Sequence, residues 1–110
     1  MKISIIIPAY NEAERIVPTL ESIYNYVSNK MYTYELIVVD DGSTDNTIEK
    51  VKGLRKQIPN LIILPLIQNQ GKGAAVRRGM LAAKGELRIF TDADGSTPIE
   101  ELDKLLEPIL

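Results

Sequence analysis

The feature that most constrains the fold is a regular alternation of short apolar runs with amphipathic segments. Four mostly apolar runs lie at residues 3–7, 35–40, 61–67 and 87–91. They do not alternate with polar residues, which is typical of strands covered on both faces. Between them, apolar residues recur at helical spacing. The alternation predicts an α/β fold with a mostly parallel sheet and helices on both of its faces.

Boundary signals mark several of the predicted elements. Asn11 can cap the first helix, with Glu14 at the capping-box position. Pro18 lies inside that helical pattern and predicts a late start or a kink. Pro65 lies within the third strand and predicts an edge position or a bulge. The remaining helices are predicted at 48–58, 74–83 and 99–109.

Composition excludes several kinds of chemistry. The 110 residues contain neither Cys nor His, which excludes disulfides, thiol nucleophiles, Cys-ligated zinc and the commonest general base. A bound metal must therefore have oxygen ligands. The formal net charge of −2 is too small to indicate a nucleic-acid partner. No apolar stretch is long enough to span a bilayer, and no signal peptide is recognisable.

Polar residues follow all four predicted strands, at 8–12, 40–43, 68–73 and 92–94. Open parallel sheets bind ligands outside the carboxyl ends of their strands. We therefore expect the four clusters to converge on one crevice. This expectation is stronger than any single motif, because the fold itself brings the clusters together.

Asp92 and Asp94 stand two residues apart at a strand end, so in extended chain they share a face. Two carboxylates on one face repel unless a positive charge lies between them. A hard divalent cation, Mg²⁺ or Mn²⁺, suits this arrangement, and such an ion usually completes its shell with water and substrate phosphates. The spacing alone is equally compatible with one Asp capping a turn and the other being solvated.

Three other features could contact a ligand, and each also has a purely structural interpretation. Asp40 and Asp41 are adjacent, so only one can face the crevice and accept hydrogen bonds from a base or ribose; the alternative is an N-cap. Lys72, between Gly71 and Gly73 before a helix, suits anions, although the glycines could serve only a tight turn. Tyr10 is equally suited to base stacking and to packing on the sheet edge.

Three stretches together resemble the family-2 glycosyltransferases of the GT-A fold: SIIIPAYNE at 4–12, ELIVVDDGSTD at 35–45 and DADG at 92–95. The stretch NQGKGAAVRRG at 69–79 most resembles the branch that makes dolichyl-phosphate glucose or mannose. The resemblance covers essentially the whole chain. It implies a Rossmann-like three-layer sandwich with a mostly parallel sheet, the N-terminal half of the GT-A fold.

The resemblance also implies roles for individual residues. Asp41 would bind the base, and Lys72 would lie near the donor phosphates. Asp92 and Asp94 match the family's Asp-x-Asp motif: Asp92 would contact the ribose or the metal, and Asp94 would hold the Mg²⁺ or Mn²⁺ that bridges the diphosphate. The metal would neutralise charge on the leaving nucleoside diphosphate. The nucleoside pocket would be lined by Pro8, Ala9, Tyr10 and Glu12. No catalytic residue is assigned.

The implied activity is metal-dependent, inverting transfer of a hexose from UDP-glucose or GDP-mannose to an acceptor such as a polyprenyl or dolichyl phosphate. A phosphate with a second pKa of about 6 is largely anionic at neutral pH, so no strong general base is needed. Residues 1–110 would form the donor half, without the acceptor half, and we expect this chain alone to be inactive. Exposed apolar surface could then drive homodimer formation.

We expect a cytoplasmic location, and a lipid-phosphate acceptor would bring the parent protein to the cytoplasmic face of a membrane. Two other functions compete with this interpretation. A sugar nucleotidyltransferase shares the architecture but has an early Gly-rich loop, whereas residues 8–11 contain no Gly. A non-catalytic nucleotide-binding fragment would use the same motifs without turnover.

Overall fold

The computed structural model describes residues 2–106, and its four strands form one parallel sheet. The strands are β1 (Lys2–Ala9), β2 (Thr33–Asp40), β3 (Leu61–Pro65) and β4 (Leu87–Phe90). Their order is β3-β2-β1-β4, and every neighbouring pair is parallel. All carboxyl ends therefore lie along the same edge of the sheet, which confirms the predicted α/β fold.

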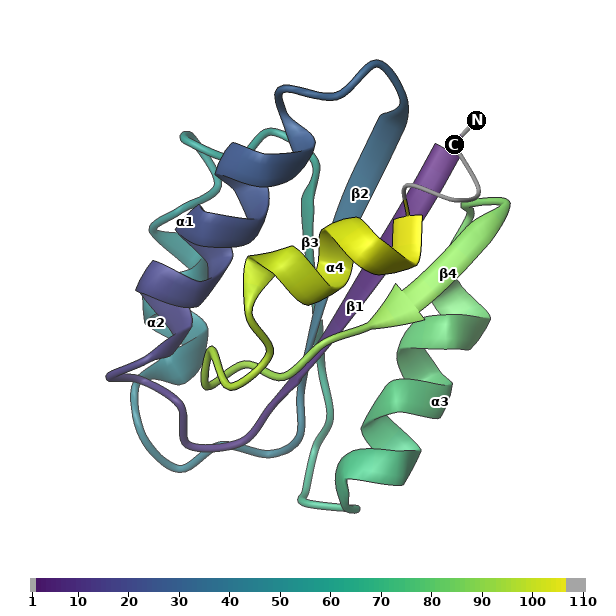
Figure 1. Cartoon of the computed structure of the whole chain (residues 1–110). Coiled ribbons are helices and arrows are strands. Elements are labelled where there is room, and N and C mark those ends of the chain that lie inside the picture. The colour runs from purple at the N-terminus through teal and green to yellow at the C-terminus, as the bar shows by residue number, and fades with distance from the viewer. Residues whose placement is uncertain (1, 107–110) are drawn as a thin grey trace.

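Helices cover both faces of this sheet and complete three layers (Figure 1). Three of them pack on one face: α1 (Ile16–Val27), α2 (Thr47–Lys52) and α4 (Ile99–Leu106). The fourth, α3 (Lys72–Ala82), packs alone on the other face, against β1 and β2. None of the described helices is long and apolar enough to cross a membrane.

Strand β1 supplies side chains to both halves of the core. Ile3, Ile5 and Ile7 are completely buried with α1, α2 and α4, whereas Ile6 is buried under α3. Gly79 allows α3 to approach closely, because a Cβ atom there would lie 2.5 Å from the Ile6 Cγ2 atom. The two-sided burial explains why the strand is apolar at successive positions.

The first helix begins later than its capping pattern predicts. Its N-cap residue is Arg15, so the predicted cap at Asn11 is wrong. Asn11 has a φ of 52°, and its Oδ1 atom accepts a hydrogen bond from the Thr44 N–H at 2.8 Å. The late start leaves Pro18 in the first turn, where helical N–H groups lack partners and proline is tolerated.

The second helix differs from its predicted length, and the third strand has its predicted position in the sheet. The second helix is shorter than predicted and ends at Lys52, but Leu54 and Ile58 remain buried in the turns that follow. Strand β3 lies at the edge of the sheet and ends at Pro65, which confirms the edge position. At an edge, the N–H that proline lacks is not required by another strand.

Candidate functional site at the carboxyl edge of the sheet

A cavity of about 330 Å³ lies beyond the carboxyl ends of the strands. Its wall contains every residue for which the family resemblance implies a nucleotide or metal role: Pro8, Ala9, Tyr10, Glu12, Asp41, Lys72, Asp92 and Asp94. The ends of β1, β2 and β4 and the start of α3 thus meet at one place, as the fold argument predicts. Whether these residues bind a nucleotide or a metal stays a prediction.

The Asp41 carboxylate organises the loop between β3 and α3. It is almost fully buried, at 3% exposure, and its oxygens accept hydrogen bonds from the N–H groups of Gln70 at 2.8 Å and Gly71 at 2.9 Å. The Asn69 Nδ2 atom donates a third, at 3.1 Å. Asp41 therefore lines the cavity and also fixes the turn that places Lys72.

The neighbouring Asp40 has a purely local role. Its two carboxylate oxygens accept hydrogen bonds from the Ser43 hydroxyl at 2.6 Å and the Ser43 N–H at 3.0 Å. The N-cap of α2 is Asn46, which makes no side-chain capping hydrogen bond, and the neighbouring Asp45 accepts a hydrogen bond from the Thr47 N–H at 3.0 Å. The structure thus divides the adjacent pair: Asp41 faces the cavity and Asp40 closes the turn after β2.

Lys72 and Asp92 form an ion pair in the cavity wall. The Lys72 Nζ and Asp92 Oδ1 atoms are 2.5 Å apart, with side-chain exposures of 59% and 32%. An exposed pair of this kind contributes about 0–1 kcal/mol to stability. A charged ligand can therefore separate the two side chains at little cost to the fold.

Ser96 connects the two carboxylates of the Asp-x-Asp motif. Its hydroxyl donates to Asp92 Oδ2 at 3.2 Å, and its N–H donates to Asp94 Oδ1 at 2.9 Å. The Ser96 hydroxyl and N–H lower the pKa of Asp94, with a smaller contribution from the Arg15 charge. Asp94 is therefore ionised at neutral pH, as a metal ligand must be.

The donor atoms of the cavity fit a hard divalent cation that brings part of its own ligand shell. Asp92 and Asp94 supply two carboxylates, and no group of three or more potential metal-ligating side chains occurs within residues 2–106. Magnesium is commonly held by one or two carboxylates together with substrate phosphates. The pair is thus compatible with an ion that binds together with a diphosphate.

Glu12 brings an unsatisfied hydrogen-bond acceptor to the same wall. Its Oε1 atom pairs with Arg15 Nη2 at 2.8 Å. Its Oε2 atom is buried and has no hydrogen-bond partner among the described residues. Buried polar atoms are rarely left unpaired, so this oxygen has the capacity to accept a further hydrogen bond.

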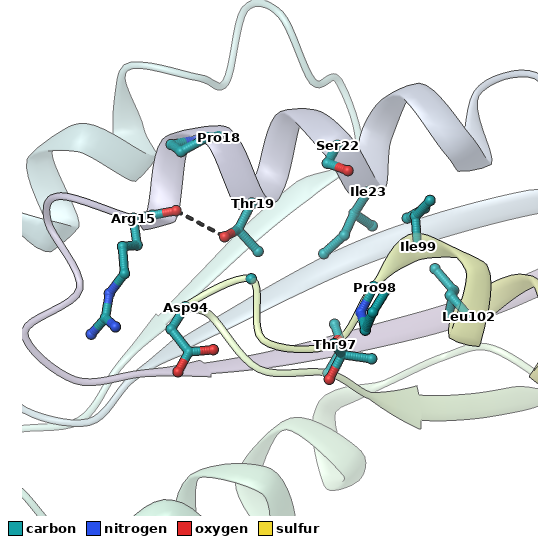
Figure 2. A pocket seen from close by; sticks show the side chains of 12 residues that line it. Arg15, Pro18, Thr19, Ser22, Ile23, Asp94, Thr97, Pro98, Ile99 and Leu102 are labelled. Carbon is teal, nitrogen blue, oxygen red and sulfur yellow. Dashed lines mark hydrogen bonds between the residues drawn. The ribbon is translucent and has the colours of Figure 1, made fainter.

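A second cavity of about 330 Å³ lies beside the first, between α1 and the segment that leads into α4. Figure 2 shows Thr19, Ser22 and Ile23 on α1 facing this segment. Asp94 lines both cavities, so they meet at that residue. Among the residues with predicted roles, the second cavity involves Asp94 alone.

Sequence reasoning assigned no individual role to two residues that shape the site, Ser96 and Asn69. Ser96 bridges the carboxylate pair, and its place two residues after Asp94 is the spacing of an Asx turn, which was available as a signal. Asn69 lines the cavity and bonds to Asp41. No local pattern identifies Asn69, because its partner lies 28 residues earlier in the chain.

Residues 4–110 match the model of glycosyl transferase family 2, and the chain belongs to that family. Its fold matches that of GT-A glycosyltransferases, and its homologues are enzymes.

Among curated proteins, the chain is similar to dolichyl-phosphate beta-glucosyltransferases. It is 39% identical over 112 residues to the ALG5A protein of Trichomonas vaginalis, covering 97% of this chain and 35% of that protein. It is 42% identical to the Drosophila melanogaster protein, covering 96% and 34% respectively. The chain therefore spans about one-third of the length of these relatives.

Two solved structures show the same fold. The mannosyltransferase PcManGT from Pyrobaculum calidifontis, in complex with GDP-Man and Mn²⁺, matches with a TM-score of 0.80 and 31% identity over 97% of this chain and 31% of that one. Glucosyl-3-phosphoglycerate synthase from Mycobacterium tuberculosis, in complex with Mn²⁺, UDP and phosphoglyceric acid, matches with a TM-score of 0.78 and 30% identity. The match covers 99% of this chain and 39% of that one.

Proposed function

We propose that this chain is the donor-binding part of an inverting, metal-dependent glycosyltransferase that transfers a hexose from UDP-glucose or GDP-mannose. The observation that carries the proposal is the convergence of all eight predicted ligand residues on one cavity wall. The solved relatives support it, since PcManGT was solved with GDP-Man and Mn²⁺ and the synthase with UDP and Mn²⁺.

In the proposed complex, different parts of the wall recognise different parts of the donor. The base would lie near Tyr10, which is 45% exposed and free to offer a ring face. The unpaired Glu12 Oε2 atom would accept a hydrogen bond from a ribose hydroxyl. Lys72, at the N-terminus of α3, would pair with a diphosphate oxygen.

Asp92 and Asp94 would hold the divalent cation, with the remaining coordination positions filled by the diphosphate and water. When bound, Mg²⁺ or Mn²⁺ would supply charge neutralisation for the departing nucleoside diphosphate. Ser96 would keep both carboxylates in place through its hydroxyl and N–H.

We propose a polyprenyl or dolichyl phosphate as the acceptor of the whole protein. Support comes from the curated relatives, which are dolichyl-phosphate beta-glucosyltransferases. An anionic phosphate oxygen can attack without a strong general base, which suits a chain without His. Acceptor contacts would lie in the other two-thirds of a full-length relative.

Titration calorimetry of the 110-residue chain tests the donor site. UDP-glucose and GDP-mannose are titrated with Mn²⁺ and again with EDTA, using the parent and the double variant D92A/D94A. We expect one nucleotide sugar to bind in Mn²⁺, and the double variant or EDTA to weaken binding at least about ten-fold. Equal binding by the double variant in Mn²⁺ would overturn the metal assignment.

The main competing function is a nucleotide-binding module without chemistry. Transfer of labelled hexose to a polyprenyl phosphate by a full-length protein containing this chain would separate the two possibilities. We expect transfer by the full-length protein and none by residues 1–110 alone.

Two further expectations about the parent protein stay predictions: a cytoplasmic location with attachment to the cytoplasmic face of a membrane, and homodimer formation. Apolar side chains that are at least half exposed, on which a dimer contact could form, occur at Met31, Ile67, Leu81, Phe90 and Leu105. Light scattering of the purified chain tests for the dimer. One chain has a mass of 12.3 kDa, so a dimer would have a mass of about 25 kDa. A mass near that of one chain would contradict dimer formation.

A further inference from the structure

An ion pair joins Lys72 to the Asp-x-Asp motif. The Lys72 Nζ atom lies 2.5 Å from Asp92 Oδ1 and 5.8 Å from the centre of the Phe90 ring. Phe90 ends β4, two residues before Asp92. The ammonium group is thus held between a carboxylate and an aromatic ring from the same strand end.

The two carboxylates of the motif differ in their partners. Asp92 has both oxygens engaged, one by Lys72 and the other by the Ser96 hydroxyl. Asp94 accepts the Ser96 N–H, and within residues 2–106 it has no cation within 4.0 Å. Within the described residues, Asp92 thus has a direct ion-pair partner, whereas Asp94 has none within 4.0 Å.

We propose that Lys72 is a positioning residue that occupies Asp92 in the donor-free protein and moves to the donor's diphosphate when metal and nucleotide bind together. This inference rests on the proposed function and adds to it a coupling between the two ligands. Lys72 and a divalent cation repel each other if both contact the same carboxylate. A cation that arrives alone must therefore displace Lys72 into water.

A cation that binds together with a diphosphate does not leave Lys72 without an anionic partner. The diphosphate offers Lys72 a new anionic partner at the N-terminus of α3, where the helix also favours anions. The displacement of Lys72 is then compensated. Metal and nucleotide consequently bind cooperatively, and each raises the affinity of the other by the same factor.

Removing the Lys72 charge should shift the two affinities in opposite directions. In K72M, Mn²⁺ alone should bind about two- to five-fold more tightly, because an exposed ion pair no longer competes. With Mn²⁺ saturating, the nucleoside diphosphate should bind about ten-fold more weakly, because one charge-assisted contact is lost. Electron paramagnetic resonance measures free Mn²⁺, and calorimetry measures UDP and GDP.

Two variants serve as controls. R77M removes the same charge from α3 at an exposed position outside the cavity wall, and should leave both affinities within about two-fold of the parent. K72R keeps the charge and should keep the coupling. Because Lys72 is 59% exposed, thermal unfolding should show that K72M folds like the parent.

The possible results separate this inference from the proposed function. The parent could bind nucleotide in a metal-dependent way while K72M gains no Mn²⁺ affinity over R77M. This result would overturn the proposed exchange of Lys72 from Asp92 to the diphosphate, and would leave the proposed function unchanged. Nucleotide binding by the parent that is equal in Mn²⁺ and in EDTA would overturn both. Opposite shifts in K72M, absent from R77M and K72R, would support the exchange.

Discussion

The two ends of the sheet each carry a carboxylate near a lysine, but the two carboxylates are placed very differently. At the amino end, Glu35 is 3% exposed and accepts hydrogen bonds from the Ser4 hydroxyl at 2.6 Å and the Lys84 N–H at 2.7 Å. At the carboxyl end, Asp92 is 32% exposed and pairs with the more exposed Lys72. The first carboxylate is satisfied by the fold, and the second remains accessible to a ligand.

The amino-end cluster holds distant parts of the chain together. The Ser4 hydroxyl, which donates to Glu35, accepts the Gly85 N–H at 2.8 Å. Gly85 lies so close that a Cβ atom there would be 2.5 Å from Ser4 Oγ. Strands β1 and β2 are thereby joined to the connection between α3 and β4. A buried acidic residue therefore indicates function only when its partners leave room for a ligand.

The largest expected effect comes from removing the amino-end carboxylate. E35A leaves the buried Ser4 hydroxyl and Lys84 N–H without their acceptor, which should lower the free energy of unfolding by about 3 kcal/mol. Urea denaturation of E35A and D92A measures the contrast, because D92A removes an exposed ion pair worth about 0–1 kcal/mol and an exposed hydrogen bond from Ser96. Equal losses in the two variants would contradict the distinction between the two ends.

An intermediate effect on stability is expected at Asp41, which is buried like Glu35 but lines the cavity like Asp92. D41A removes the acceptor for the Gln70 and Gly71 N–H groups and should cost about 1–2 kcal/mol. Hydrogen exchange should accelerate at these two amides in D41A and stay unchanged in D92A. Unaltered exchange in D41A would show that the carboxylate does not organise the loop.

The contrast also shows what the sequence can predict. The apolar runs are sufficient to predict the parallel sheet. Because parallel sheets bind ligands at the carboxyl ends of their strands, the positions of Tyr10, Asp41 and Asp92 are sufficient to predict that they meet at one cavity. The amino-end cluster was not predictable, because the N–H that Glu35 accepts belongs to Lys84, 49 residues later. Local patterns reveal local caps and strand ends, whereas distant pairs depend on the completed packing.

The capping error at Asn11 has the same origin. Its sequence neighbours suit a helix cap, but the side chain instead accepts a hydrogen bond from Thr44, 33 residues away. This contact joins the loop after β1 to the loop after β2. A long-range partner thus overrode the local preference.

The smallest expected effect is a dependence of stability on pH at Glu35. Burial raises the pKa of Glu35, but hydrogen bonds from the Lys84 N–H and the Ser4 hydroxyl, with the Lys2 and Lys84 charges, outweigh it and lower the pKa below its ordinary value of 4.5. The ionised form is therefore favoured by folding. Its contribution is present above pH 4.5 and is lost as the pH falls through the lowered pKa.

Unfolding of the parent and E35Q across pH 3–7 measures this dependence. The stability difference between them should be constant at neutral pH and should shrink as the pH falls below the ordinary value of 4.5. A difference that grows on acidification would contradict the assigned direction.

The most direct test of the central claim, that the carboxyl edge binds the metal and nucleotide, is paramagnetic broadening of backbone amide signals by Mn²⁺ in the presence of UDP or GDP. An eight-residue strand such as β1 separates the two ends by roughly 25 Å. We predict loss of the signals of Tyr10, Gly71 and Ala93, while those of Glu35 and Gly85 persist. Broadening that begins at Glu35, or spreads evenly along the strands, would contradict the assignment.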